Sequence, residues 1–176
     1  TLIAVIIAFV AAFIIFMCGG KDTSDKKTIR IGVSLYRSND TFISSIKKEM
    51  ENYVKYYEKR NKIKLNMEIV DAGGSQSTQN KQVDRFISLD YDVICINPVE
   101  RANASVIIDK AIAADIPVVF FNREPVEDDM KRSSKFCYVG ADPKESAVLE
   151  GQILVDAYKK NKRSLDLNGD GEVSYI

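Results

Sequence analysis

Histidine is absent from this chain of 176 residues. Histidine is the side chain whose ordinary pKa lies nearest neutrality, and it is the commonest general acid or base in enzymes. Its absence excludes Ser-His-Asp triads and zinc sites that contain imidazole. Acid–base chemistry would then fall to carboxylates or lysine, so an enzyme is not excluded but has lost its commonest catalytic residue.

Net charge is also absent, because 25 Lys and Arg residues balance 25 Asp and Glu residues. Proteins that bind nucleic acid or anionic membranes through their overall field carry an excess of basic residues. The balance therefore gives no electrostatic case for a nucleic-acid partner or for an anionic membrane surface. No nucleic-acid partner is expected.

Cysteine is scarce, with only Cys18, Cys95 and Cys137. Cys95 lies in an apolar strand-like run, where a free cysteine behaves as a small buried hydrophobe. A Cys95–Cys137 disulfide is not favoured, since nothing in the sequence shows that their Cα atoms approach closely enough.

Long apolar runs are limited to one segment of sixteen residues, 2–17, which Cys18 and then a polar stretch follow. As a helix this segment would measure about 24 Å, which is shorter than the roughly 30 Å hydrocarbon core. A short apolar stretch that ends at a cysteine and small residues resembles a bacterial lipoprotein signal, with Cys18 as the lipidated residue. The alternative is an uncleaved membrane anchor at residues 1–18. Both interpretations export the rest of the chain, attach it to a membrane and make residues 19–28 a linker.

Strand-like and helix-like patterns alternate along the middle of the chain. Short apolar or alternating runs predict five strands, at residues 29–35, 63–69, 92–96, 117–121 and 136–139. Apolar residues spaced three or four apart predict helices at residues 43–57, 83–87 and 106–111. Strands joined through helices form βαβ crossovers, which predicts an α/β fold with a doubly wound parallel sheet.

A further helix start is marked by three residues after Gly140. Asp142 suits the N-cap, Pro143 the first helical position and Glu145 the third. We therefore expect a helix from residue 143 to about Ala157.

Polar residues follow the predicted strands where a ligand would bind. In open parallel sheets, ligands lie beyond the carboxyl ends of the strands. The segments there are residues 36–42, 71–74, 97–98 and 122–125. They are rich in Asp and Asn, include an aromatic ring and lack the glycine-rich loop of phosphate sites. Amides and carboxylates can bind neighbouring hydroxyls while a ring covers a sugar's C–H face, which favours a neutral polyhydroxylated ligand over a nucleotide.

Oxygen-bearing residues alternate along residues 166–174, in the pattern of an EF-hand-type calcium loop. Positions 1, 3, 5, 7 and 9 of such a loop correspond to Asp166, Asn168, Asp170, the Glu172 carbonyl and the Ser174 hydroxyl. Gly171 falls at position 6, where a positive φ turns the chain around the ion. This predicts a structural Ca²⁺ site, and the alternative is a metal-free turn.

Four motifs occur in the order and spacing of one protein family. They are residues 31–36 with 40–42, residues 117–125, residues 138–146 and the calcium-type loop. With them, the chain from Ile29 to Ile176 resembles the galactose/glucose branch of the type I periplasmic binding proteins. These are the receptors of sugar ABC importers and, in some bacteria, of chemotaxis, and a loop of this kind is characteristic of that branch.

The resemblance implies roles for four residues. Asp40 would accept hydrogen bonds from sugar hydroxyls, and Phe42 would stack against the pyranose ring. Asn122 would bind ring hydroxyls, with Arg123 beside it where the family usually has lysine. Without the resemblance, Asp40 is more simply an N-cap, Phe42 a core or staple aromatic, Asn122 a loop residue at the strand end and Arg123 solvated surface. Asn97 is interpreted as part of a turn.

The resemblance also implies a division into domains. A first α/β sugar-binding domain would span residues 29–139, a hinge crossover residues 140–142, and the start of a second domain residues 143–176. The two domains would close over a sugar without making or breaking a bond.

The sequence therefore predicts a receptor anchored in the periplasm or at the cell surface, and not an enzyme. It would bind D-galactose or D-glucose and deliver it to an ABC permease, and in some bacteria to a chemoreceptor. One alternative is a membrane-tethered sugar-sensing domain of a signalling system. Another is an exported carboxylate-dependent hydrolase, which would need two facing acids where the rim offers only Asp40 and Glu124.

Overall fold

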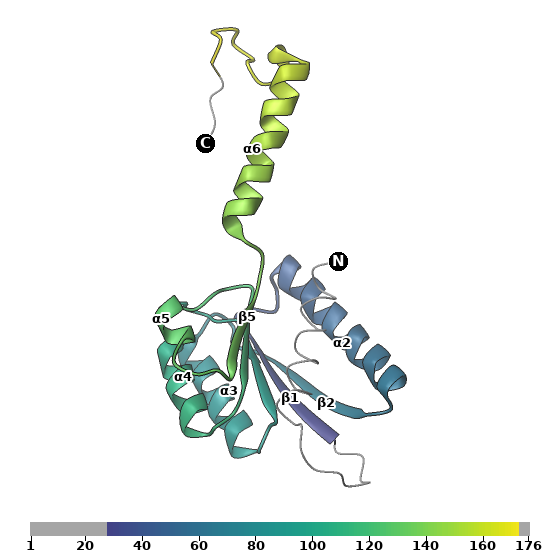
Figure 1. The fold of residues 1–176 in the computed structure, drawn as a ribbon, viewed down its shortest axis with the longest axis vertical. Helices are drawn as coiled ribbons and strands as arrows, with labels where there is room; N and C mark the ends of the chain where they lie inside the picture. Colours follow the sequence, from purple (N-terminus) through teal and green to yellow (C-terminus); the bar gives the residue numbers. More distant parts are fainter. Residues whose placement is uncertain (1–27, 173–176) are drawn as a thin grey trace. The chain divides into compact units, whose positions relative to one another are not determined.

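The structure, a computed structural model that describes residues 28–172, follows the expected alternation of strand and helix (Figure 1). The predicted anchor, the lipidation site at Cys18 and the calcium ligand at Ser174 lie outside these residues. In chain order, the elements are β1 (Thr28–Leu35), α2 (Thr41–Asn61), β2 (Lys64–Asp71), α3 (Gln76–Ser88), β3 (Val93–Ile96), α4 (Ala104–Ala113), β4 (Val118–Phe121), α5 (Glu127–Met130), β5 (Phe136–Val139), α6 (Pro143–Lys160) and the 3₁₀ turn η1 (Lys162–Ser164).

The five strands form one parallel sheet in the order β2-β1-β3-β4-β5. The chain leaves β1 toward β2 on one side and then crosses to β3 on the other side. The strand order therefore reverses between β1 and β3, which is where such sheets open a crevice at their carboxyl ends. The predicted doubly wound α/β fold is confirmed.

Apolar residues cover both faces of the sheet, because side chains alternate along each strand. Ile94 and Ile96 of β3 join the core beneath α3 and α4. Val93 and Cys95 join the core beneath α2. Figure 1 shows α2 on one side of the sheet and α3 and α4 on the other. Gly32 lets α3 approach, since an added Cβ would come within 2.6 Å of the Phe86 ring.

Both described cysteines are free thiols. The register places Val119 of β4 between Cys95 and Cys137, so two strand spacings, or roughly 10 Å, separate them. That separation exceeds the reach of a disulfide, which confirms the expectation. Burial raises the pKa of Cys95 to about 12, so this thiol is not available as a nucleophile.

The structure divides into two compact units between Gly140 and Ala141. In the second unit, α6 begins as predicted: Asp142 is the N-cap, Pro143 opens the helix, and the Asp142 carboxylate accepts from the Lys144 backbone N–H at 2.8 Å. Apolar side chains along α6 are exposed, and they are Val148, Leu149, Ile153, Leu154 and Val155. Within residues 28–172, no helix combines the length and the apolar character needed to cross a bilayer.

Two short elements were not predicted, α5 and η1. The α5 segment has no apolar periodicity, because three of its four residues are acidic. Ion pairs accompany it instead: Lys131 contacts Glu127 at 2.8 Å, and Arg132 reaches Asp109 and Asp129. Such one-turn helices are set by local contacts that a hydrophobic pattern does not encode.

Candidate functional site

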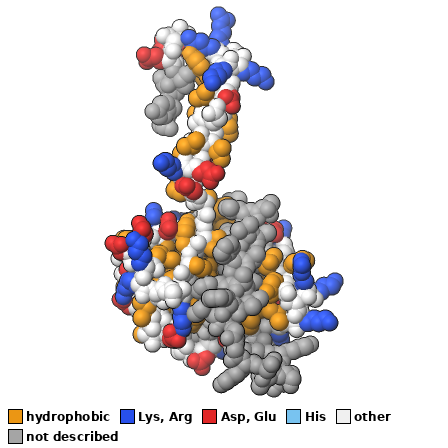
Figure 2. All heavy atoms as spheres, viewed as in Figure 1, with side chains coloured by type: hydrophobic (Ala, Val, Ile, Leu, Met, Phe, Trp, Pro, Cys, Tyr) orange, Lys and Arg blue, Asp and Glu red, His pale blue; other side chains and the backbone are white. Residues whose placement is uncertain are grey.

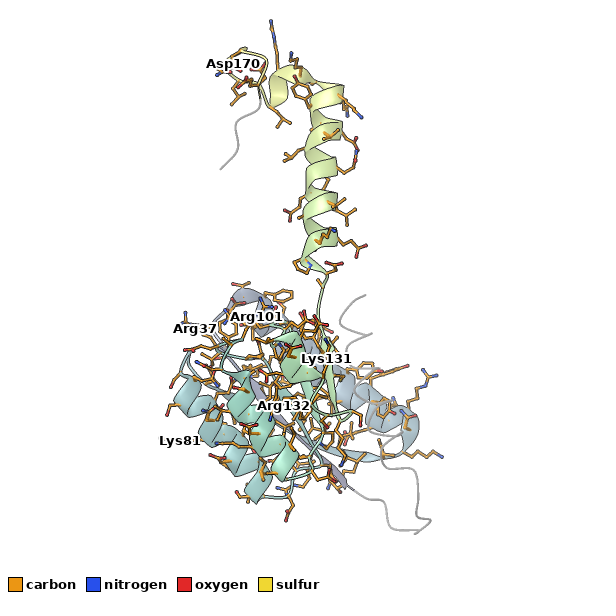
Figure 3. All side chains as sticks on the ribbon, turned by 60° about the vertical axis from the view of Figure 1, so that its left-hand side comes forward. Arg37, Lys81, Arg101, Lys131, Arg132 and Asp170 are labelled. Atoms are coloured by element: carbon orange, nitrogen blue, oxygen red, sulfur yellow. The ribbon has the colours of Figure 1, made fainter. Side chains whose placement is uncertain are left out.

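The loops that follow β1, β3 and β4 are held side by side at the carboxyl edge of the sheet. The Asn97 N–H donates to the carbonyl of Ser34 at 2.9 Å, and the Asn122 N–H donates to that of Val139 at 3.0 Å. Arg37 and Arg101, labelled in Figure 3, lie at this edge. Five side chains from these loops make up what we call the rim. They are Tyr36, Asp40, Asn97, Asn122 and Arg123.

Asp40 is the N-cap of α2, as one interpretation of the sequence expected. Its Oδ1 accepts from the Ile43 N–H at 2.9 Å, and its Oδ2 accepts from the Tyr36 hydroxyl at 2.6 Å. The Tyr36 hydrogen bond, followed by that from Ile43, lowers the pKa of Asp40 below its ordinary value. Each carboxylate oxygen has a further lone pair. Capping therefore fixes an ionised acceptor in place, and its contact with a sugar stays a prediction.

Phe42 lies in the first turn of α2 with 56 % of its surface exposed. A core or staple aromatic would be largely buried, so the alternative of a core residue is wrong. The exposed ring is free to cover the apolar face of a ligand. Phe42 lies close to Asp40 in sequence but is not one of the five rim residues, and its stacking role stays a prediction.

Arg123 is not a solvated surface residue, because from its position after β4 its side chain contacts the loops that follow β1 and β3. Its guanidinium carbon lies 4.0 Å from the centroid of the Tyr36 ring, a cation–π contact. Its Nη1 donates to the carbonyl of Val99 at 2.8 Å. Arg123, Tyr36 and Asp40 thus form a continuous chain of contacts from β4 across β1 to the start of α2.

Asn122 adopts a left-handed backbone conformation, with φ of 62°. Residues other than glycine seldom take this conformation, and such outliers gather at functional sites. Its carbonyl accepts from the Tyr138 hydroxyl at 3.1 Å, which helps hold the turn. Its side-chain Nδ2 lies 3.5 Å from Oδ1 of Asn97. The two amides therefore meet across the ends of β3 and β4.

Asn97 lies in one of the segments that the sequence placed at this edge, but it was interpreted as part of a turn and not as a binding residue. Its side chain is fully buried, and its Nδ2 is the one buried side-chain polar atom in residues 28–172 without a hydrogen-bond partner. Folded proteins rarely leave such a donor unpaired, because desolvation costs about 1–3 kcal/mol. A polar residue directly after the fully buried run of β3 was the available signal.

A satisfied polar network lies beneath Asn97 and holds its backbone. The buried Gln79 side chain donates to the Asn97 carbonyl at 2.9 Å and to Ser34 Oγ at 3.1 Å, and it accepts from the Val99 N–H at 2.9 Å. Ser34 Oγ in turn donates to Gln82 Oε1 at 2.7 Å. These contacts fix the loop after β3, so the unpaired amide belongs to a rigid support rather than to a loose turn.

The calcium-type loop in the second unit has the backbone geometry that its sequence predicts. Gly171 has φ of 91°. The Asp166 carboxylate, largely buried, accepts from the Gly169 N–H at 2.8 Å and the Gly171 N–H at 3.0 Å. The Asp170 carboxylate accepts from the Glu172 N–H at 2.8 Å, and Asn168 Nδ2 donates to it at 2.7 Å.

The donors in this loop fit a hard cation, which prefers oxygen ligands. Across residues 28–172, no group of three or more His, Cys, Asp and Glu side chains meets as metal ligands. A cation held by Asp166 and Asp170 would therefore also need neutral oxygens, such as those of Asn168 and the Glu172 carbonyl. The metal itself stays a prediction.

Comparison with known proteins places most of the chain in one family. The family described as "Periplasmic binding protein domain" matches residues 31–176. The D-galactose/methyl-galactoside binding periplasmic protein MglB of Haemophilus influenzae is 40% identical over 147 residues, which cover 84% of this chain and 43% of that protein. The ribose import binding protein RbsB of Bacillus subtilis is 26% identical and matches 84% of this chain and 45% of its own length.

A solved structure agrees with this placement. The periplasmic binding protein of the arabinose ABC transporter from Shewanella sp. ANA-3, bound to L-arabinofuranose, is 28% identical with a TM-score of 0.61. The match covers 75% of this chain and 41% of that one. The chain thus spans less than half the length of the relatives that it matches.

Replacing Tyr36 by phenylalanine tests how the rim holds Asp40. The Tyr36→Phe variant loses the hydroxyl that lowers the Asp40 pKa, so that pKa should rise toward its ordinary value, measured by carboxyl-carbon NMR titration. Because the folded pKa is depressed, the carboxylate stabilises the fold above the unfolded pKa of about 3.9 and loses that effect as the pH falls through the folded pKa. The variant should lose part of this pH-dependent stability.

Tyr56→Phe is the matched control, since the Tyr56 hydroxyl accepts from Arg60 and does not contact Asp40. It should leave the Asp40 titration unchanged. An Asp40 pKa that is the same in wild type and in Tyr36→Phe would contradict the proposed positioning.

Proposed function

Because the chain belongs to the periplasmic binding protein family, we propose that its rim is one wall of the binding cleft of a receptor for a neutral monosaccharide. The observation that carries this proposal is Nδ2 of the buried Asn97 amide, which has no hydrogen-bond partner in the described residues, at the point where the strand order reverses. A ligand hydroxyl would provide the missing acceptor. Because the Asn97 amide is fully buried in the absence of a ligand, some of the atoms that bury it must move when a sugar binds.

The rim and the neighbouring Phe42 offer complementary groups to a sugar. The Asp40 carboxylate accepts hydrogen bonds from hydroxyls, the Asn97 and Asn122 amides both donate and accept, and the exposed Phe42 ring covers a C–H face. Arg123 positions Tyr36 and, through it, Asp40. None of these groups acts on a bond. Asp40, with its lowered pKa, suits a permanent acceptor and not a general acid.

We propose D-galactose or D-glucose as the ligand. The 40% identical relative is named for D-galactose and methyl-galactoside, whereas relatives at lower identity are named for ribose or arabinose. The receptor would deliver its sugar to an ABC permease, and in some bacteria to a chemoreceptor. It would work outside the cytoplasm, attached to the membrane through a lipid on Cys18 or through an uncleaved anchor.

Removing the Asn97 side chain tests the sugar site. In the full-length protein, Asn97→Ala should weaken binding of galactose and glucose by about 5- to 150-fold, since a desolvated sugar hydroxyl loses its partner at a cost of roughly 1–3 kcal/mol. Isothermal titration calorimetry measures this. The sugar-free variant should keep its stability to within about 1 kcal/mol, because the amide makes only the long Asn122 contact within the protein.

Asn103→Ala provides the control, because Asn103 is exposed and its amide contacts Glu100. It should bind both sugars like the wild type. If Asn97→Ala also binds them like the wild type, the assignment of Asn97 is wrong. A loss of sugar-free stability with unchanged affinity would make Asn97 a structural residue.

The proposed calcium site predicts metal-dependent stability. Calcium should raise the thermal midpoint of the full-length protein, by an amount equivalent to about 2.7 kcal/mol at a free concentration 100 times the Kd. Magnesium should have less effect, because it prefers a smaller octahedral site with several waters. Differential scanning calorimetry with and without each ion measures both effects.

Asp166→Ala should abolish the calcium effect, because Asp166 is the buried carboxylate around which the loop folds. Asp156→Ala removes an acid from α6 that contacts only Gln152 in the described contacts, and it should keep the effect. Equal stabilisation of wild type and Asp166→Ala by calcium would refute the site.

A further inference from the structure

A cluster of basic side chains lies at the end of the sheet opposite the rim. Its four basic residues are Lys59 and Arg60 in the last turn of α2, Lys62 at the C-cap of that helix and Lys64 at the start of β2. Tyr56 of α2 completes the cluster. We call this cluster the basic corner. All five side chains are exposed. Figure 2 shows Lys and Arg side chains projecting over α2 at the right-hand edge of the molecule.

The charge of the basic corner is not neutralised within the described chain. No ion pair joins Lys59, Lys62 or Lys64 to any residue in 28–172. The neighbouring acid, Glu58, accepts from the Leu65 N–H at 2.8 Å. Elsewhere on the same unit, half-buried Lys110 is paired with Asp84 at 2.7 Å, whereas exposed Lys48, Lys55 and Lys81 form no ion pair with the described residues but are not gathered at one corner. The zero net charge of the whole chain therefore conceals a local excess of positive charge.

Helix chemistry explains only part of this excess. Lys59 and Arg60 lie in the last turn of α2, where cations interact favourably with the helix dipole. Lys62 is the C-cap with φ of 55°, a left-handed position that favours glycine or asparagine. Lys64 is the first residue of β2 and lies outside the last turn of the helix. Neither Lys62 nor Lys64 is accounted for by backbone requirements.

The chain enters the fold at the same corner. The first described residue, Thr28, is paired in register with Lys64 on the neighbouring strand. Ten residue steps separate Thr28 from Cys18, so the two residues lie at most about 35 Å apart. With the predicted membrane attachment at Cys18, the basic corner would stay close to the lipid surface. The intervening sequence adds Lys21, Lys26 and Lys27.

We propose that the basic corner docks on the anionic phospholipid headgroups of the membrane to which the chain is attached. Each Lys or Arg near such a surface favours the docked state by roughly fivefold. Tyr56, 52 % exposed, has the amphipathic ring typical of membrane interfaces. Attachment makes docking an intramolecular event, so a few charges suffice.

Docking would orient the binding unit. Because β1 runs from the basic corner at Thr28 to the rim after Leu35, lipid contact at one end leaves the rim at the other end open to solvent. This inference takes the membrane attachment from the sequence and does not depend on which sugar is bound. Its failure would therefore leave the sugar proposal untouched.

A tryptophan reporter tests the docking, read as the difference in fluorescence from the full-length protein without the substitution in the same vesicles. Full-length Tyr56→Trp protein is reconstituted with vesicles that carry a nitroxide-headgroup quencher. One set is phosphatidylcholine alone, and the other includes roughly 30 mol% phosphatidylglycerol. Quenching should appear only in the anionic vesicles at about 0.1 M salt, and it should disappear at about 1 M salt, where the Debye length falls from about 10 Å to about 3 Å.

Two charge-matched variants complete the experiment on this background. Lys59→Gln/Lys62→Asn/Lys64→Gln should lower the ratio of docked to undocked protein by roughly 100-fold. The control, Lys47→Gln/Lys48→Gln/Lys81→Gln, removes the same charge outside the basic corner and should keep the quenching. Equal quenching in neutral vesicles, no quenching in either set, or equal loss in both variants would overturn the proposal.

Discussion

The unpaired Nδ2 of the buried Asn97 side chain is the constraint on which the interpretation of the carboxyl edge of the sheet depends. It follows a strand whose four residues are buried, so no water reaches it from the sheet. Gln79 and Ser34 fix the backbone beneath it but offer its side chain nothing. Several satisfied hydrogen bonds thus hold one unsatisfied donor in a fixed position, where an acceptor from outside the protein can pair with it. The family relationship makes a sugar hydroxyl the natural candidate.

In the proposed site, the atoms of the remaining rim residues that hold the structure together are also those that would contact a sugar. Asp40 begins α2 and is also the acceptor that a sugar would meet, while Tyr36 orients it and Arg123 fixes Tyr36. The groups are therefore held in position before a ligand arrives, which reduces the entropy lost on binding. The fold separates this edge from the basic corner by the length of β1, so a sugar and a membrane could be bound at the same time.

The sheet could be predicted from the sequence because short apolar runs mark its strands and its helices have clear apolar faces. In β3, for example, Val93 and Cys95 face one core and Ile94 and Ile96 face the other. The start of α6 could also be predicted, since Asp142 and Pro143 determine it through contacts within the first turn. The contacts that Asn97 and Arg123 make within the protein could not be predicted, because they join segments distant in sequence, respectively Gln79 and Tyr36. The one-turn helix α5 was missed because it is accompanied by ion pairs rather than by an apolar pattern. The basic corner could not be predicted from the balanced overall charge, because its residues come from a helix end and a strand that only the fold brings together.

The most direct measurement of the central claim is the side-chain amide signal of Asn97 in a nitrogen–proton NMR spectrum of the full-length protein. On addition of D-galactose or D-glucose, the account predicts a shift of this signal and slower exchange of its protons with solvent, because the amide gains an acceptor. An Asn97 signal that no monosaccharide alters at saturating concentration would contradict the account.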